Sequence, residues 1–320
     1  MKNNYFTIVL LILLGTLSSN AQQDPQYTQY MYNTQVVNPA YAGSRDVTSF
    51  GLLGRTQWVS IDGAPKSGTF TVNTPVGSLD NMGLGLTIVH DELGPAVESN
   101  ITIDYAYRID VGENAKVSFG LKGGLDILDV DFTKLNLNDQ TPDVLFQNNI
   151  DSRLQPQIGA GVYYNTEKFY AGLSVPNFLT TDHYDDSTTQ NIINDPQFNG
   201  DVTAAERLHY FLIAGYVFDL SETVKFKPAT LVKAVSGSPL QWDASANFLL
   251  YDKLTLGASY RWSAAVSALV GFQASDQIFI GFGYDYSTTD IEDFSDGSYE
   301  LFLRFDLFNK PDRVLTPRFF

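Results

Sequence analysis

The clearest feature of the chain is an alternation of apolar and polar residues that begins near Asp46 and continues almost to the end. A period of two predicts β-strands with one apolar and one polar face. Strands in globular proteins are commonly about 5–6 residues long, whereas a tilted strand that crosses a bilayer needs about 9–11. The run over residues 97–111 is long enough to cross, and it sets an apolar face (Val97, Ile101, Ile103, Tyr105, Tyr107, Ile109) against a polar one (Glu98, Asn100, Thr102, Asp104, Arg108, Asp110).

The same alternation recurs along the chain and predicts fourteen strands. Because only a helix or a closed barrel satisfies every backbone polar group in lipid, strands of this kind must close on themselves. We therefore predict an all-β fold, a transmembrane antiparallel β-barrel over residues 47–308 with an N-terminal plug or periplasmic segment. The expected strands are 47–58, 67–76, 81–90, 96–111, 115–130, 155–165, 168–176, 206–219, 223–235, 240–251, 253–263, 265–274, 276–287 and 297–308.

The connections between these strands alternate between short and long. The two longest, 131–154 and 177–205, and the acidic stretch 288–296 all fall at the same end of the expected barrel. Short periplasmic turns and longer outer loops are typical of bacterial barrels. With an even number of strands, we expect both termini to face the periplasm.

Residues 1–21 have the form of a cleavable secretory signal peptide. Lys2 supplies the positive charge, residues 6–14 are apolar, and Ala21 ends a short stretch suited to signal peptidase. The alternative is a membrane anchor, but the apolar run is shorter than the roughly 18–20 residues needed to span a bilayer. The absence of cysteine excludes a lipid anchor and a disulfide framework.

Residues 22–46 fit neither a strand nor a helix. They are rich in Gln, Asn, Tyr and Pro, and two prolines, Pro25 and Pro39, disfavour a helix or a central strand. We expect an ordered segment, placed either as a plug in the periplasmic half of the lumen or as a flap under the rim. A disordered leader is the alternative, although so many aromatic residues are unlike disordered composition. Residues 309–320 are expected to form a periplasmic tail.

Several motifs of this chain have counterparts in one family. The order Asp-Pro, Gln-Tyr-Met-x-Asn and Asn-Pro-Ala-Tyr-Ala-Gly resembles the mature amino terminus of the PorP/SprF family. Later stretches are similar in the same order, except that Tyr299 stands where the family usually has His. The matching residues at the amino terminus are Asp24, Pro25, Gln29, Tyr30, Met31, Asn33, Asn38, Pro39, Tyr41 and Gly43, and the later stretches include 55–58, 257–261, 297–300 and 317–320.

The resemblance implies a non-enzymatic outer-membrane component of the type IX secretion and gliding machinery. Such a protein would assist the export or surface attachment of secreted adhesins and would contact periplasmic and outer-membrane components of the machinery. We expect the outer loops to bind the adhesin, and the amino-terminal motif residues and the tail to bind periplasmic partners.

The charge pattern indicates a polar interior. The net charge of −16 argues against a nucleic-acid partner, which would need clustered Lys and Arg. Charged residues of both signs fall on the expected inward faces, as either a polarised pore or an ion-paired, closed lumen; the second is favoured because a plug and inward side chains can fill a barrel of this size. The residues are Arg55, Asp104, Arg108, Asp243, Arg261, Asp285, Arg304 and Asp306.

The sequence offers little for catalysis, cofactor binding or metal binding. The three histidines, His90, His183 and His209, are far apart in the strand plan. Acidic residues before Gly297 could form a Ca²⁺ loop, although a solvated acidic loop is favoured over it. These residues are Asp290, Glu292, Asp293 and Asp296.

Two other functions remain as alternatives to a secretion component. A passive outer-membrane porin or transport channel would use the same barrel with an open lumen. A barrel lipase or protease would need a nucleophile turn or a His–acid pair, and neither motif is recognisable.

Overall fold

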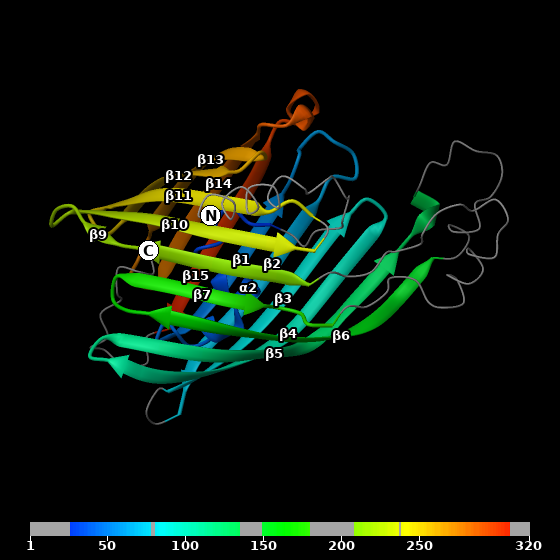
Figure 1. The fold of residues 1–320 in the computed structure, drawn as a ribbon. Coiled ribbons are helices and arrows are strands. Elements are labelled where there is room, and N and C mark those ends of the chain that lie inside the picture. Colours follow the sequence, from blue (N-terminus) through cyan, green and yellow to red (C-terminus); the bar gives the residue numbers. More distant parts are fainter. Residues whose placement is uncertain (1–25, 78–80, 135–148, 180–207, 237, 308–320) are drawn as a thin grey trace, which may run out of the picture.

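The computed structural model describes residues 26–77, 81–134, 149–179, 208–236 and 238–307. Within them, each strand pairs antiparallel with its neighbours, and β1 (Thr48–Thr56) pairs with β15 (Ser298–Leu307) to close the sheet. The two-residue strand β9 (Phe218–Asp219) continues β8 on the same partner, β10, so the described wall is a closed barrel of fourteen strands (Figure 1). The predicted fold is confirmed.

The other strands have these bounds: β2 (Lys66–Val76), β3 (Met82–Leu93), β4 (Ala96–Gly112), β5 (Ala115–Val130), β6 (Ile150–Asn165), β7 (Phe169–Val175), β8 (His209–Tyr216), β10 (Val224–Val235), β11 (Gln241–Leu250), β12 (Leu254–Arg261), β13 (Ala265–Gln273) and β14 (Ile278–Ser287). Short helices are α2 (Thr34–Val37), η1 (Pro39–Tyr41), η2 (Phe132–Lys134) and η4 (Asp290–Phe294). No helix among the described residues is both long and apolar enough to cross a membrane.

The two faces of the wall differ as the alternation predicts. On β4 the outward Ile103 is 61% exposed, whereas the inward neighbours Thr102 and Asp104 are fully buried. Aromatic rings also run outside β7, β8, β9, β10 and β11 near the ends of these strands, where they contact one another from strand to strand. An apolar outer band bordered by aromatic residues is the surface that a barrel presents to lipid.

The two ends of the barrel have different connections. We call the end with residues 57–65, 131–149, 176–208 and 288–297 the long-loop end, and the end with 113–114, 166–168, 220–223, 251–253 and 274–277 the short-turn end. The chain enters β1 and leaves β15 at the short-turn end. By the usual asymmetry of bacterial barrels, the long-loop end faces outward.

Some strand bounds differ from those expected. The strand expected at 155–165 begins five residues earlier, at Ile150, because a bulge carries it past a break in the alternation. Ser152 has a positive φ of 48° beside that bulge. The strand expected at 206–219 is interrupted at Val217, whose backbone N–H donates to Lys168 in the neighbouring turn.

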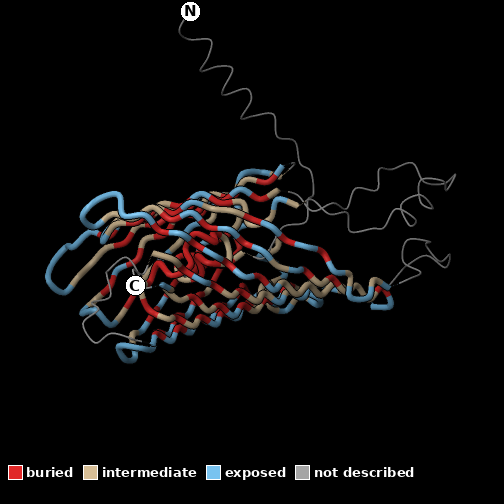
Figure 2. The backbone as a smooth tube through the Cα atoms, turned by 90° about the horizontal axis from the view of Figure 1, so that it is seen from below, coloured by how far each residue is buried: buried red, intermediate tan, exposed pale blue. Residues whose placement is uncertain are grey.

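Residues 26–46 lie inside the barrel and form the core of the molecule. Most of them are buried, and they appear as the buried segment enclosed by the wall (Figure 2). Helix η1 packs against β4, β5 and β6. We call residues 26–46 the plug.

The plug extends further than the sequence suggested. We expected it in the periplasmic half of the lumen or under the rim. Instead Gln26 donates a hydrogen bond to Gln241, the first residue of β11, at the long-loop end. Arg45 pairs with Asp306 in β15, at the short-turn end. The plug therefore runs the length of the lumen.

Arginine substitutions will test which face contacts lipid. Ile103→Arg and Phe282→Arg should each destabilise the folded barrel by about 2–4 kcal/mol, because each puts a charge into the apolar band. Asn100→Arg, whose side chain lines an internal pocket, should cost less than half as much. Unfolding of the vesicle-bound protein in guanidinium chloride measures the free energy of unfolding of each variant. Equal losses in all three variants would contradict the assigned faces.

Candidate functional site

The plug folds as a series of short turns. Asn38 is extended, as expected before a proline, and its side chain accepts a hydrogen bond from Ala40 N–H. Pro39 is the first residue of η1, where its missing N–H is not needed. The short helices of the plug leave many of its backbone groups without a partner inside the segment, so the barrel wall must supply those partners.

One set of such partners lies at the long-loop end. The Glu300 carboxylate accepts hydrogen bonds from the backbone N–H groups of Thr28, at 2.9 Å, and Gln29, at 2.8 Å. The Thr28 hydroxyl donates to Asp285. Arg55 bridges both carboxylates, at 2.6 Å from Asp285 and 3.1 Å from Glu300. Asp285, Glu300 and Arg55 come from three strands and, together with Thr28, form what we call the outer cluster. This cluster fixes the beginning of the plug.

A second set holds the other end of the plug. The Arg45 guanidinium lies 2.8 Å from the Asp306 carboxylate, and Ser49 also donates to Asp306. Arg108 donates to the carbonyl of Gly43 and to the Asp46 carboxylate, at 2.6 and 2.7 Å. We call Arg45, Asp46, Ser49, Arg108 and Asp306 the inner cluster. The plug is thus fixed at both ends by charged groups in the wall.

Between the clusters the contacts are amide and aromatic. The Gln35 amide donates to backbone carbonyls of β2 and β3. The Tyr32 ring stacks on Phe302 with a centroid distance of 5.6 Å, and the Tyr41 ring meets Tyr163 edge-on at 5.5 Å.

Two wall glycines allow the plug to approach closely. A side chain on Gly83 would overlap the backbone carbonyl of Ala42, and one on Gly120 would overlap the backbone of Ala40. At these positions the plug lies directly against the sheet.

The structure places all of the predicted lumen residues on inward faces. Six are buried in ion pairs with wall or plug residues: Arg55, Asp104, Arg108, Asp285, Arg304 and Asp306. The other two form the pair Arg261–Asp243, at 2.9 Å, near Gln241. The geometry is that of a lumen braced by ion pairs.

The structure also locates the predicted amino-terminal residues. Asp24 and Pro25 lie outside the described residues. The others are all buried in the lumen: Gln29, Tyr30, Met31, Asn33, Asn38, Pro39, Tyr41 and Gly43. These eight residues therefore belong to the packed interior of the barrel.

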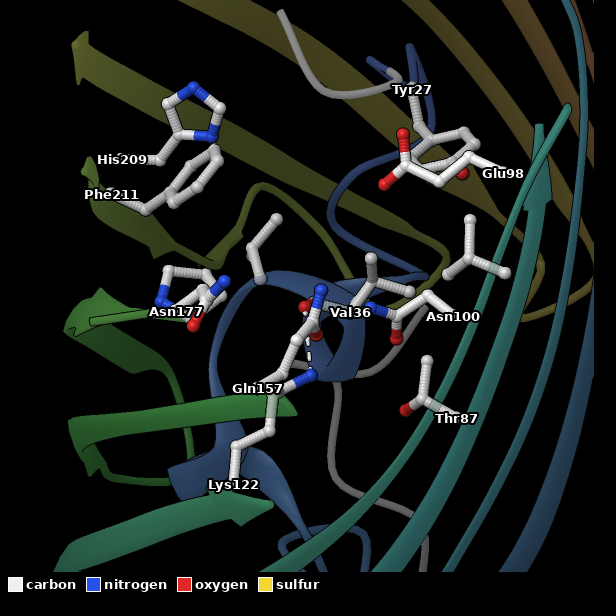
Figure 3. Close-up of a pocket in the computed structure, with 13 residues that line it drawn as sticks. Tyr27, Val36, Thr87, Glu98, Asn100, Lys122, Gln157, Asn177, His209 and Phe211 are labelled. Atoms are coloured by element: carbon white, nitrogen blue, oxygen red, sulfur yellow. Dashed lines mark hydrogen bonds between the residues drawn. The ribbon is translucent and has the colours of Figure 1, made fainter. Parts of the chain in front are cut away.

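A cavity of about 90 Å³ lies between the plug and the wall. Tyr27 and Val36 line it from the plug, and Glu98, Lys122 and His209 line it from the wall (Figure 3). The Lys122 ammonium is occupied, since it donates to the Val36 carbonyl and lies 3.5 Å from Asp104.

The acidic residues considered for Ca²⁺ lie apart from one another on an exposed connection. Among the described residues, no group of three or more His, Cys, Asp or Glu side chains is arranged to hold a metal ion. Asp290, Glu292 and Asp293 are exposed on η4, and Asp296 accepts a hydrogen bond from Ser60. Of the histidines, His90 lies beside Glu92 on the exposed end of β3, His209 lines the cavity, and His183 is outside the described residues.

Comparison with known families identifies the barrel. Residues 19–305 match the type IX secretion system membrane protein PorP/SprF. The chain belongs to the PorP/SprF family. As a PorP/SprF β-barrel, the protein is an outer-membrane component of the type IX secretion system, as the resemblance of its motifs implied.

Solved structures similar to this PorP/SprF protein are outer-membrane barrels of low sequence identity. The Acinetobacter baumannii outer membrane protein Omp33 is 8% identical with a TM-score of 0.45, over 82% of this chain and 99% of that one. The Ralstonia pickettii toluene transporter TbuX is 10% identical with a TM-score of 0.46, over 90% and 95%. A Pseudomonas aeruginosa FadL homologue is 12% identical with a TM-score of 0.42, over 91% and 95%. No curated protein matches the sequence.

Sequence reasoning missed several residues that hold the plug of this PorP/SprF protein. Thr28, Arg45 and Glu300 are central to the two clusters but were not singled out as site residues. Glu300 could have been found, since it alternates with the outward Leu301 and ends the family-like stretch 297–300. Gly83 and Gly120 gave no signal beyond their small size.

A pair of glycine substitutions on β5 will test the close approach of the plug. Gly120→Ala should destabilise the protein by about 1–3 kcal/mol, because the added methyl group overlaps the plug backbone and overpacks the lumen. Gly123, three residues further along β5, has open space around it. Gly123→Ala should therefore leave stability within about 0.5 kcal/mol of the wild type. Unfolding from lipid vesicles measures both, and a similar loss in the two variants would contradict the packing.

The outer cluster predicts a large effect of Glu300→Ala. This substitution removes the acceptor of two backbone N–H groups and leaves Arg55 with one carboxylate partner, Asp285, so it should cost about 3–5 kcal/mol. Glu222→Ala, in a short turn, should change stability by less than about 0.5 kcal/mol. Protease digestion of the folded variant should also release fragments cut within 26–33. An unaltered digestion pattern with full stability would argue against the role of Glu300.

Proposed function

We propose that this protein is a non-conducting accessory that assists the export or surface attachment of secreted adhesins by the type IX secretion and gliding machinery. The observation that carries the proposal is the plug, which runs through the lumen and is held by charged groups at both ends. A passive channel needs an open lumen, whereas a docking component of a secretion apparatus does not.

The partners follow from the two ends of the barrel. The long-loop end supports contact with a secreted adhesin, and the short-turn end with residues 309–320 supports contact with periplasmic components. The apolar outer band supports outer-membrane lipid as the surroundings of the wall. Residues 1–21 act as the cleavable signal peptide in this proposal, on their sequence features alone.

The plug gives the amino-terminal family motif a structural role. The motif residues Gln29, Tyr30, Asn33 and Asn38 bind the wall of their own barrel. A periplasmic partner that bound them would first have to withdraw the plug. We therefore assign the periplasmic contact to the short turns and the tail.

Deletion of residues 23–33 will test the proposal. The deletion removes the first eight residues of the plug, which include Thr28 at the outer cluster, and leaves every strand intact. We expect the barrel to insert and to remain heat-modifiable on gels, and adhesin export to fall at least tenfold. In planar bilayers the wild type should conduct little, and the deletion variant should form steady channels.

The controls separate an accessory from a channel. A large, steady conductance of the wild type would favour the passive channel. Undiminished export by the deletion variant would contradict a role of the plug in secretion. Affinity capture from mildly solubilised envelopes should recover other secretion components with the wild type, and recovery of none would count against the proposal.

A further inference from the structure

The direction of the plug in the lumen has a consequence for the amino terminus. Gln26, the first described residue, contacts the first residue of β11 at the long-loop end. Thr28 binds Asp285, near the end of β14, and Glu300, near the start of β15. Both contacts lie beside the long connection 288–297.

The chain then descends through the lumen in order. Tyr30 contacts Ser245 in the middle of β11, and the Val36 carbonyl accepts a hydrogen bond from Lys122 in the middle of β5. Gly43 lies against Gly83, at the start of β3, and Arg45 pairs with Asp306, near the end of β15. The beginning and the end of the plug therefore lie at opposite ends of the barrel.

The residues that precede Gln26 cannot return to the short-turn end. Cleavage after Ala21 leaves four residues before Gln26, which reach at most about 14 Å even when fully extended, whereas a strand of nine residues is about 30 Å long. The lumen beside them is already filled by the plug, whose residues 27–31 are buried. The contacts of the plug therefore favour an amino terminus at the long-loop end, against the expectation that both termini face the periplasm.

We propose that the amino terminus of this protein is displayed on the outer face of the membrane, as the leading end of a segment that spans the lumen. A partner outside the cell can then bind the end of the plug directly, while β15 ends on the periplasmic side. The identity of that partner, a secreted adhesin, rests on the proposed function; the placement of the amino terminus rests on the contacts of the plug and on removal of residues 1–21.

Cysteine labelling of intact cells tests this placement. The chain contains no cysteine, so each single substitution gives an unambiguous signal. Gln23→Cys should react with a membrane-impermeant maleimide on intact cells at least ten times more than Glu222→Cys in a short turn. Asp62→Cys, in the exposed 57–65 connection at the long-loop end, marks the outer face. Heat-modifiable migration on gels confirms that each variant is folded.

Two results would overturn the proposal. In the first, Gln23→Cys is labelled only after the outer membrane is permeabilised, as Glu222→Cys is expected to be. In the second, Glu222→Cys is labelled on intact cells and Asp62→Cys is not, which would reverse the barrel in the membrane. Labelling does not depend on adhesin export, so loss of the proposed function and loss of this inference are distinguishable.

Discussion

The structure depends on filling a lumen that the inward side chains of the barrel wall cannot fill by themselves. Eight-stranded barrels are filled by inward side chains, and barrels of sixteen to eighteen strands leave an aqueous channel. The fourteen strands here lie between these cases, and the plug occupies the remaining space. Because unpaired buried polar groups are costly, each charged group in the lumen needs a partner. Glu300 illustrates this, since one carboxylate serves two plug N–H groups and Arg55.

The alternation predicted the faces of the wall because a strand's side-chain direction is a local property. It failed where local geometry changes: the bulge beside Ser152 concealed the first five residues of β6. The alternation also predicted that Arg55 and Asp285 point inward, but it did not predict that they form a pair. A period of two gives the direction of a side chain and does not say which strand lies next to it around the barrel. The direction of the plug had no local signal, since contacts such as Thr28–Glu300 join residues 272 positions apart.

These distant contacts tie the seating of the plug to the closure of the barrel. The plug precedes β1 in the chain, but its beginning binds β14 and β15, the last strands. Its later part packs on β3 to β6. The outer cluster can form only when Arg55 of β1 lies beside Glu300 of β15, and these two residues are direct partners across the strand pair that closes the sheet. Closure of the barrel and fixation of the plug therefore stabilise each other.

The chemistry of the plug also bears on whether it can move. An apolar plug would be held by burial alone, and its withdrawal would expose apolar surface to water at a cost of about 25 cal/mol for each Å². This plug is held partly by aromatic contacts such as Tyr32 on Phe302, and partly by ion pairs and hydrogen bonds, whose net contribution is small once both partners are hydrated. Water that enters the lumen can hydrate Arg45, Asp306 and the outer cluster as their partners leave. A lumen lined with charged pairs thus fixes one position of the plug, and hydration of those pairs would offset part of the cost of withdrawing it.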